Sequence, residues 1–316
     1  MAGILVVAEV IGGELSPTSL ELLGAARKLS SEGAGSVTAF VAGEDHAQAL
    51  ISGGADAVVA GTAAFTSYDT YLPAVDAAIE QSGADIVLVG QSSLGRDLGP
   101  AIAFRHKVAV SMDTNAMGID NGRLRATRSA YGGNARAEHT FQGDLQVVTV
   151  KGKQFDALEP DSSRTGSVTT TDAIGETSIS IVSTDKAESE GIKLEDADAI
   201  VSGGRGLGDA AGFAGLEELA ALLGGAVGAS RAACDLGWYP PSQQVGLTGK
   251  TVTPNLYIAV AISGASQHMA GMTGAKNIVA INKDEDANMV RVSRFAVIED
   301  YKNVVPALVE EIQKLL

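Results

Sequence analysis

Cysteine, basic residues and long apolar runs are all scarce in this chain of 316 residues. The single cysteine, Cys234, excludes an intrachain disulfide and any metal site built from several thiolates, and we interpret it as a small apolar core residue. The 23 basic residues are outnumbered by 38 acidic ones, giving a net charge of −15. This balance argues against a nucleic-acid partner, because binding to phosphate backbones requires a basic face.

Features of targeting and membrane insertion are also missing. The apolar start MAGILVVAEV contains no basic residues and is followed by Ile11 and then Gly12-Gly13, so we expect that it is not a secretory signal peptide. An Arg-rich, acid-poor presequence is absent, and no apolar stretch approaches the roughly 20 residues that span a bilayer. We therefore expect a cytoplasmic protein that is not inserted in a membrane.

The residues that are abundant predict a well-packed α/β protein. Apolar residues make up 45% of the chain and charged residues 19%, which is sufficient for large cores. The length of 316 residues allows two domains of ordinary size. The 38 glycines fit many tight turns between strands and helices.

Strands and helices alternate in the first half of the chain. The apolar run 4–8 precedes Ser16-Pro17, which suit the N-cap and the first turn of a helix. The similar segments GGADAVVAG (53–61) and SGADIVLVG (82–90) each contain a continuous apolar strand, as expected for parallel strands buried on both faces. Further along we expect antiparallel strands over 113–155, a surface excursion over 159–177 and a strand at 178–183.

The charged stretch at residues 185–196 marks the predicted domain boundary. We assign residues 1–185 to an N-terminal α/β domain with antiparallel additions, 186–196 to a linker and 197–316 to a second domain. The elements expected in the second domain are a strand at 199–202, a helix at 216–223, a strand near 291–297 and a closing helix at 305–316.

Two glycine-containing segments of the second domain are candidates for phosphate and ring binding. In SGGRGLG at 202–208 the backbone can approach a pyrophosphate closely, and Arg205 can neutralise its charge. The spacing is not the dinucleotide fingerprint, and a glycine-rich turn with a surface arginine is an equal alternative. In GASRAA at 228–233, small residues around Ser230 and Arg231 leave room for a flat ring, although a surface arginine is favoured for this segment alone.

Two further segments follow in the sequence. QVGLTGK at 244–250 lacks the spacing of a nucleotide-triphosphate loop, but Thr248 and its backbone amides suit the edge of a heterocycle. SGASQH at 263–268 is a glycine turn between a strand and a helix, which places N–H groups beside a phosphate and His268 one turn further on. A structural histidine is the alternative, but two other glycine-rich turns nearby favour a functional one. No metal site and no catalytic Ser–His–Asp set is indicated, because His46, His106 and His139 are scattered.

Taken together, these segments resemble the α subunit of electron-transfer flavoprotein. The matching residues are VSGGRGLG (201–208), VGASRAA (227–233), QVGLTGK (244–250), ISGASQHMAGM…IVAINKD (262–284) and VVP (304–306). The first domain agrees more loosely through ILVVAE (4–9), the helix after Leu15-Ser16-Pro17 and YGGNA (131–135). The resemblance implies a nucleotide-hydrolase-like α/β first domain and a Rossmann-like, deoxyhypusine-synthase-like second domain that binds FAD.

The resemblance also implies an electron carrier rather than an enzyme that converts a substrate. Members of this family pair with a β subunit and bind one FAD mainly in the second domain of α. They accept electrons from dehydrogenases, notably the acyl-CoA dehydrogenases of fatty acid β-oxidation, and pass them to a quinone-linked oxidoreductase. Some members carry a second flavin in the β subunit and split electrons between two acceptors.

By motif position, the resemblance implies which residues of the second domain lie near each part of the FAD. Arg205, Ser263 and Gly264 are expected at the pyrophosphate, and Asn282 and Asp300 toward the ribose and adenine. At the isoalloxazine we expect Arg231, Thr248 and His268, the last as an imidazolium beside negative charge on the flavin. The full expected cofactor-binding set is Arg205, Ser230, Arg231, Val245, Gly246, Leu247, Thr248, Ser263, Gly264, Ala265, Ser266, Gln267, His268, Asn282, Asp300 and Tyr301.

Four positions depart from the family pattern. Leu247 stands where Gln is common, Ala261 where Gly precedes the turn, Ser266 where a β-branched apolar residue is frequent, and Tyr301 replaces a Leu-like residue. Two other classes of protein are alternatives: an NAD-dependent enzyme of the deoxyhypusine-synthase-like fold, for which no catalytic lysine or base can be placed, and a non-redox nucleotide-binding regulatory protein built on the first domain. A tightly bound yellow chromophore separates the flavoprotein from both.

Overall fold

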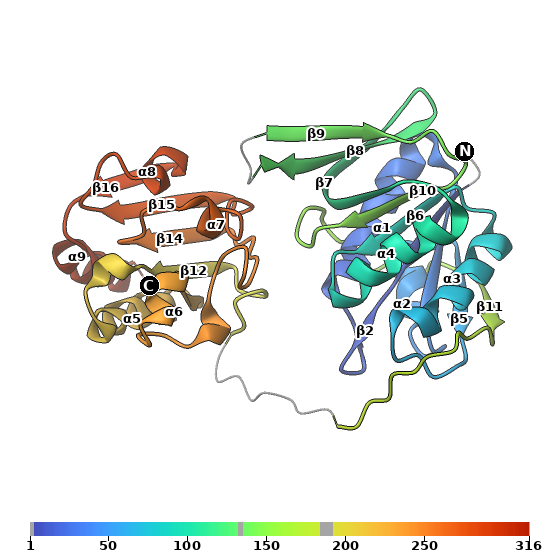
Figure 1. Cartoon of the computed structure of the whole chain (residues 1–316), viewed down its shortest axis with the longest axis horizontal. Coiled ribbons are helices and arrows are strands. Elements are labelled where there is room, and N and C mark those ends of the chain that lie inside the picture. The colour runs from blue at the N-terminus through green and yellow to red at the C-terminus, as the bar shows by residue number, and fades with distance from the viewer. Residues whose placement is uncertain (1–2, 132–134, 184–191, 316) are drawn as a thin grey trace. The chain divides into compact units, whose positions relative to one another are not determined.

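The computed structural model describes residues 3–131, 135–183 and 192–315. They form two compact units, one built from residues 3–130 and 135–183 and the other from residues 192–315. Each unit is a largely parallel sheet covered by helices, so the α/β class expected from the sequence is confirmed (Figure 1). The first part of the predicted linker and three residues of YGGNA lie outside the described residues.

The first unit contains, in its described part, a sheet with the order β11-β5-β4-β1-β6-β10-β7-β8-β9. Neighbouring strands are parallel from β11 to β7 and antiparallel from β7 to β9. The strands are β1 (Gly3–Val7), β4 (Ser36–Ala42), β5 (Ala57–Gly61), β6 (Ile86–Gly90), β7 (Val110–Asp120), β8 (Arg123–Ala130), β9 (Ala135–Thr140), β10 (Gln146–Val150) and β11 (Ser167–Thr171), with a separate hairpin of β2 (Val10–Ile11) and β3 (Glu14–Leu15).

Helices cover both faces of this sheet. They are α1 (Pro17–Leu29), α2 (Ala47–Ser52), α3 (Tyr68–Ser82) and α4 (Ser93–His106). Ile4 and Val6 of β1 pack in the core with α1 and α2, whereas Leu5 and Val7 pack in the core with α3 and α4. Burial on both faces explains why β1 is apolar at every position. The Ser16 hydroxyl caps α1 by accepting a hydrogen bond from the Ser19 N–H at 3.2 Å, as expected.

Two expectations for the later part of this unit were wrong, and the mostly exposed segment 159–177 contains a strand that was not expected. β10 lies between β6 and β7 and is parallel to both, so the antiparallel extension comprises only β7, β8 and β9. The segment 159–177 contains β11, which pairs with β5 at the sheet edge and has mostly exposed side chains. Residues 178–183 form no strand despite their alternation, because no described strand pairs with them.

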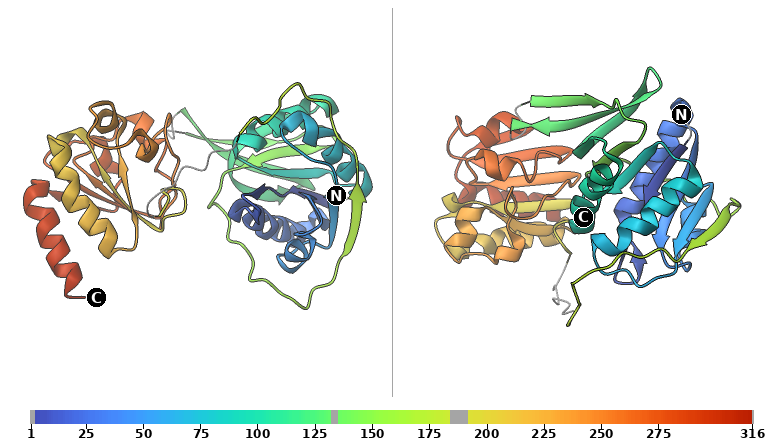
Figure 2. Two further views of the ribbon diagram at one scale, coloured as in Figure 1. Left: turned by 90° about the horizontal axis from the view of Figure 1, so that it is seen from below. Right: turned by 45° about the vertical axis from the view of Figure 1, so that its right-hand side comes forward.

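The second unit contains, among its described residues, one parallel sheet with the order β13-β12-β14-β15-β16. Its elements are β12 (Ala199–Gly203), α5 (Ala214–Leu222), β13 (Ala226–Ala229), α6 (Arg231–Asp235), β14 (Leu256–Val260), α7 (Ser266–Met269), β15 (Asn277–Asn282), α8 (Asn288–Val292), β16 (Phe295–Ile298) and α9 (Tyr301–Gln313). In the left view of Figure 2, α9 (red) lies beside α5 (yellow). The strand expected near 291–297 begins only at Phe295, since α8 occupies the residues before it.

The strand order of this second sheet reverses next to β12. The chain passes from β12 to β13 on one side and then to β14 on the other, so the loops leaving the carboxyl ends of β12 and β14 diverge. In open parallel sheets such a reversal is the usual place for a ligand crevice. In the described ranges, no helix has the length and apolar character needed to cross a membrane.

Leu88 on β6 tests the core of the first unit. Its side chain is completely buried, so we expect Leu88→Ala to lower the free energy of unfolding by about 2–5 kcal/mol through the cavity that it leaves. Phe104 on α4 is 87% exposed, and Phe104→Ala should cost less than about 0.5 kcal/mol. Urea unfolding followed by circular dichroism measures both, and equal losses would contradict this core.

Candidate functional site

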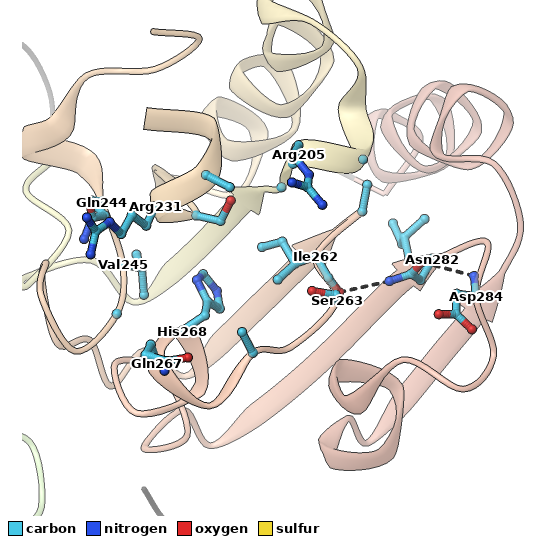
Figure 3. A pocket seen from close by; sticks show the side chains of 18 of the residues that line it. Arg205, Arg231, Gln244, Val245, Ile262, Ser263, Gln267, His268, Asn282 and Asp284 are labelled. Carbon is cyan, nitrogen blue, oxygen red and sulfur yellow. Dashed lines mark hydrogen bonds between the residues drawn. The ribbon is translucent and has the colours of Figure 1, made fainter. Parts of the chain in front are cut away.

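A cavity of about 720 Å³ lies at the carboxyl edge of the second sheet. Its walls come from the segments that follow β12, β13, β14, β15 and β16 (Figure 3). The volume is within the range of roughly 300–1,000 Å³ that is typical of cofactor and small-molecule sites. The cavity therefore occupies the place that the strand order indicates for a ligand.

Two glycines let the loops around the cavity pass close to neighbouring backbone. The Gly204 N–H donates to the Val260 carbonyl at 2.9 Å, and a Cβ at Gly204 would lie 2.2 Å from the carbonyl oxygen of Ala261. Gly264 has a φ of +82°, and a Cβ there would lie 2.3 Å from the Met289 amide nitrogen. The path of the chain alone therefore requires glycine at both positions.

The two arginines of the cavity differ in their partners. Arg231, at the start of α6, pairs with Asp235 one helical turn later, with 3.2 Å between Nε and Oδ2. The two side chains are 68% and 63% exposed, so this pair contributes little and can be exchanged for a ligand at small cost. Arg205 forms no ion pair with any residue that the structure describes. Its charge is therefore available to an anion.

The segment 244–250 forms a closed loop beside α7. The Lys250 N–H donates to the Gln244 carbonyl at 2.7 Å, and the Leu247 N–H donates to the Gln267 carbonyl at 2.7 Å. The Thr248 hydroxyl accepts a hydrogen bond from the Gln244 amide at 3.0 Å, which leaves its own proton available as a donor. The Leu247 side chain is 68% exposed and offers no polar group.

His268 is the buried titratable group of the cavity. Its side chain is 7% exposed, and its Nε2 lies 2.9 Å from the phenol oxygen of Tyr257. Burial lowers the pKa of His268 from 6.5 to about 4, against a smaller raising effect of the Val245 backbone. At neutral pH the ring is therefore neutral in this structure, which differs from the imidazolium expected from the sequence. An anion bound beside it would raise the pKa again.

Asn282 and Tyr301 use their polar groups to hold the loops of the cavity. The Asn282 Nδ2 donates to the Ile262 carbonyl at 2.9 Å, and its Oδ1 accepts from the Asp284 N–H at 3.1 Å (Figure 3). The Tyr301 phenol donates to the Leu207 carbonyl at 2.8 Å. Asn282 thus joins the segments after β14 and β15, and Tyr301 joins α9 to the glycine-rich loop after β12.

Most residues expected at the cofactor line the cavity. They are Arg205, Ser230, Arg231, Val245, Gly246, Leu247, Thr248, Ser263, Ala265, Gln267, His268, Asn282 and Tyr301. Gly264, Ser266 and Asp300 are not part of the lining, although each is next to a residue that is. Asp300 instead caps α9, accepting from the Lys302 N–H at 3.0 Å, and pairs with Lys283 at 2.8 Å.

Sequence reasoning missed several lining residues. They are Gly204, Gly206, Ala232, Asp235, Gln244, Ala261, Ile262, Ile281, Lys283, Asp284 and Glu299. Nearly all lie within or directly beside the glycine-containing segments, so extending each segment by one residue would have found them. Asp235 was detectable as the residue four positions after Arg231 on one helix face.

The fold and the cavity define a two-unit α/β protein with a cofactor-sized site in its second unit. Residues 4–175 match the family model described as an electron transfer flavoprotein domain, and residues 193–273 match that of the electron transfer flavoprotein FAD-binding domain. The chain is 42% identical to the electron transfer flavoprotein subunit alpha of Thermoanaerobacterium thermosaccharolyticum, over 98% of this chain and 97% of that relative. It is 38% identical to the subunit alpha of Bacillus subtilis, over 99% and 98%. The chain therefore belongs to the electron transfer flavoprotein alpha-subunit family.

The lowered pKa of His268 predicts a pH-dependent stability. Between its ordinary value of 6.5 and about 4 the unfolded chain binds a proton that the folded chain does not, so stability falls as the pH falls through this window. From about pH 7 to pH 5 we expect the flavin-free chain to lose roughly 2 kcal/mol more than His268→Gln. Urea unfolding at both pH values measures the difference. Equal losses in the two proteins would contradict a neutral buried ring.

Proposed function

We propose that this chain is the FAD-binding subunit of a heterodimeric electron carrier in the cytoplasm. It pairs with an electron-transfer flavoprotein β subunit, accepts electrons from dehydrogenases such as acyl-CoA dehydrogenases, and passes them to a quinone-linked oxidoreductase. The observation that carries the proposal is the cavity of the second unit, where an unpaired arginine, a threonine hydroxyl and a buried histidine surround a cofactor-sized volume.

The groups around the cavity fit the parts of an FAD. When bound, FAD supplies the redox chemistry, and the protein binds and orients it. Arg205 supplies the charge for a pyrophosphate, and Ser263 lines the same cavity. Thr248 supplies a hydroxyl donor and His268 an imidazole for the edge of a ring system.

Substrate-converting chemistry of the NAD-dependent kind is less well supported. Lys283 lines the cavity, but its ammonium pairs with Asp300, and this contact raises the pKa of Lys283. A lysine held as a charged partner is a poor base or nucleophile. The Nε2 of His268 is engaged with Tyr257. These contacts favour electron transfer by a bound cofactor over acid–base catalysis.

The first unit supports a regulatory nucleotide site poorly. Its strand order also reverses, between β1 and β6, but side chains occupy this place. Glu9, which follows β1, is 8% exposed and accepts a hydrogen bond from the Ser92 hydroxyl at 2.6 Å. Burial raises the pKa of Glu9. Thr18 also packs here, since a Cβ at Gly90 would lie 3.2 Å from its methyl carbon. A buried carboxyl group at this point opposes phosphate binding.

An absorbance spectrum and a dithionite titration of the chain co-purified with its β subunit test the proposed function. We expect a flavin spectrum and about one FAD per heterodimer. About two flavins per heterodimer would favour the alternative, an electron-splitting carrier with a second FAD in the β subunit. A colourless, correctly folded complex would overturn the flavoprotein assignment.

Arg205 provides a test of the pyrophosphate position. We expect Arg205→Gln to raise the dissociation constant of FAD by roughly 10–100-fold, because a hydrogen bond to a charged group contributes about 1.5–3 kcal/mol. Arg294→Gln is the control, since Arg294 lies in the same unit and donates to the Asn277 side chain at 2.8 Å without lining the cavity. Quenching of flavin fluorescence measures both constants. Equal affinities would place the pyrophosphate elsewhere.

A further inference from the structure

Behind the cavity, the second unit buries polar side chains against one face of its sheet. Ser202 on β12 and Tyr257 on β14 are both 0% exposed, and His268 on α7 is 7% exposed. Tyr257 belongs to the core cluster that also contains Ile200 and Val245. Buried polar atoms are normally hydrogen-bonded. The donor or acceptor role of one group therefore limits the roles that the adjacent polar groups can take.

The strand register brings Ser202 and Tyr257 together. Ile200 lies opposite Tyr257 and Ser202 lies opposite Ala259, so Ser202 and Tyr257 are diagonal neighbours on the same face of the sheet. Burial raises the pKa of Tyr257, and the nearby Ser202 hydroxyl partly lowers it. The Ser202 hydroxyl has no hydrogen bond of regular geometry among the described residues. Ser202 is thus a buried donor without an acceptor of its own in the described part of the chain, on the same face of the sheet as the Tyr257 phenol.

The Tyr257 phenol also contacts His268. Its oxygen lies 2.9 Å from Nε2, which is a normal hydrogen-bond distance. If the Ser202 hydroxyl donates to the phenol oxygen, the phenol hydrogen remains for Nε2. An Nε2 that accepts leaves the imidazole proton on Nδ1. Nδ1 is buried and has no hydrogen-bond partner among the described residues, so it is the ring nitrogen left for a bound ligand.

We propose that Tyr257 is a positioning residue for His268, whose phenol donates to Nε2 and holds the ring in one orientation as the Nδ1–H tautomer. The assignment of this ring to a flavin edge rests on the proposed function, but the tautomer does not. A ring fixed in this way meets a cofactor with its donor already placed, so no reorientation is needed on binding. Tyr257 does not line the cavity itself and acts only through His268.

Tyr257→Phe tests the proposal because it keeps the buried ring and removes only the hydroxyl. The readout is the ¹⁵N spectrum of the full chain, in complex with its β subunit and labelled at histidine, with His268→Gln identifying the resonances. We expect a single Nδ1–H tautomer in the original protein and a mixture in Tyr257→Phe. Tyr239→Phe is the control, since Tyr239 stacks on Phe213 with ring centroids 4.4 Å apart in the same unit and outside the cavity.

Two outcomes would overturn the positioning role. One is the Nε2–H tautomer in the original protein, and the other is an unchanged single tautomer in Tyr257→Phe. Ser202→Ala provides a second variant that keeps both rings and should also produce a mixture, since the phenol is then able to accept from Nε2. The flavin potential of the loaded complex is measured in parallel, and we expect it to shift in Tyr257→Phe but not in Tyr239→Phe. Absence of flavin from the original complex would refute the proposed function and leave the tautomer result intact.

Discussion

The cavity depends on how closely the backbones leaving β12 and β14 approach each other before they separate. At the end of β14, Ala261 adopts a φ of +54°, which costs a residue with a Cβ about 1 kcal/mol or more. Two hydrogen bonds hold it there: its N–H donates to the Ile281 carbonyl at 2.8 Å, and its carbonyl accepts from the Gly206 N–H at 3.3 Å. Glycine, which the resemblance led us to expect at this position, would adopt this φ without strain. The contact between the loops is therefore strong enough to maintain a conformation that alanine disfavours.

Burial determines the charge state of His268 and Tyr257. The desolvation that lowers the pKa of His268 also raises the pKa of Tyr257, so both groups are neutral near pH 7. A neutral hydrogen-bonded pair avoids the desolvation cost that a buried ion pair would incur. The two arginines of the cavity, Arg205 and Arg231, are exposed instead. The site thus combines a buried neutral pair, Tyr257 and His268, with exposed arginines.

The sequence predicted those features that depend on local patterns. β1 and the start of α1 followed from a continuous apolar run and the Ser16 cap, because both are set by neighbouring residues. β11 was missed because an edge strand with exposed side chains lacks an apolar signature. The parallel pairing of β10 was missed because it depends on strands distant in the sequence. The positions of the cavity residues followed from motifs, whereas Tyr257 looked like any apolar strand residue, since its contact with His268 forms only when α7 packs against the sheet.

Two of the departures noted in the sequence, Tyr301 and Leu247, belong to different segments around the cavity. Tyr301 donates to the Leu207 carbonyl, a contact that a leucine could not make, and so adds a fixed point to the loop that carries Arg205. Leu247 is 68% exposed in the loop of Thr248 and lacks the amide that glutamine would offer there. Tyr301 thus adds a hydrogen bond to the loop of Arg205, whereas Leu247 leaves the loop of Thr248 without a polar side chain at this position. If FAD binds as proposed, Thr248 and His268 would carry more of the orientation of the flavin ring.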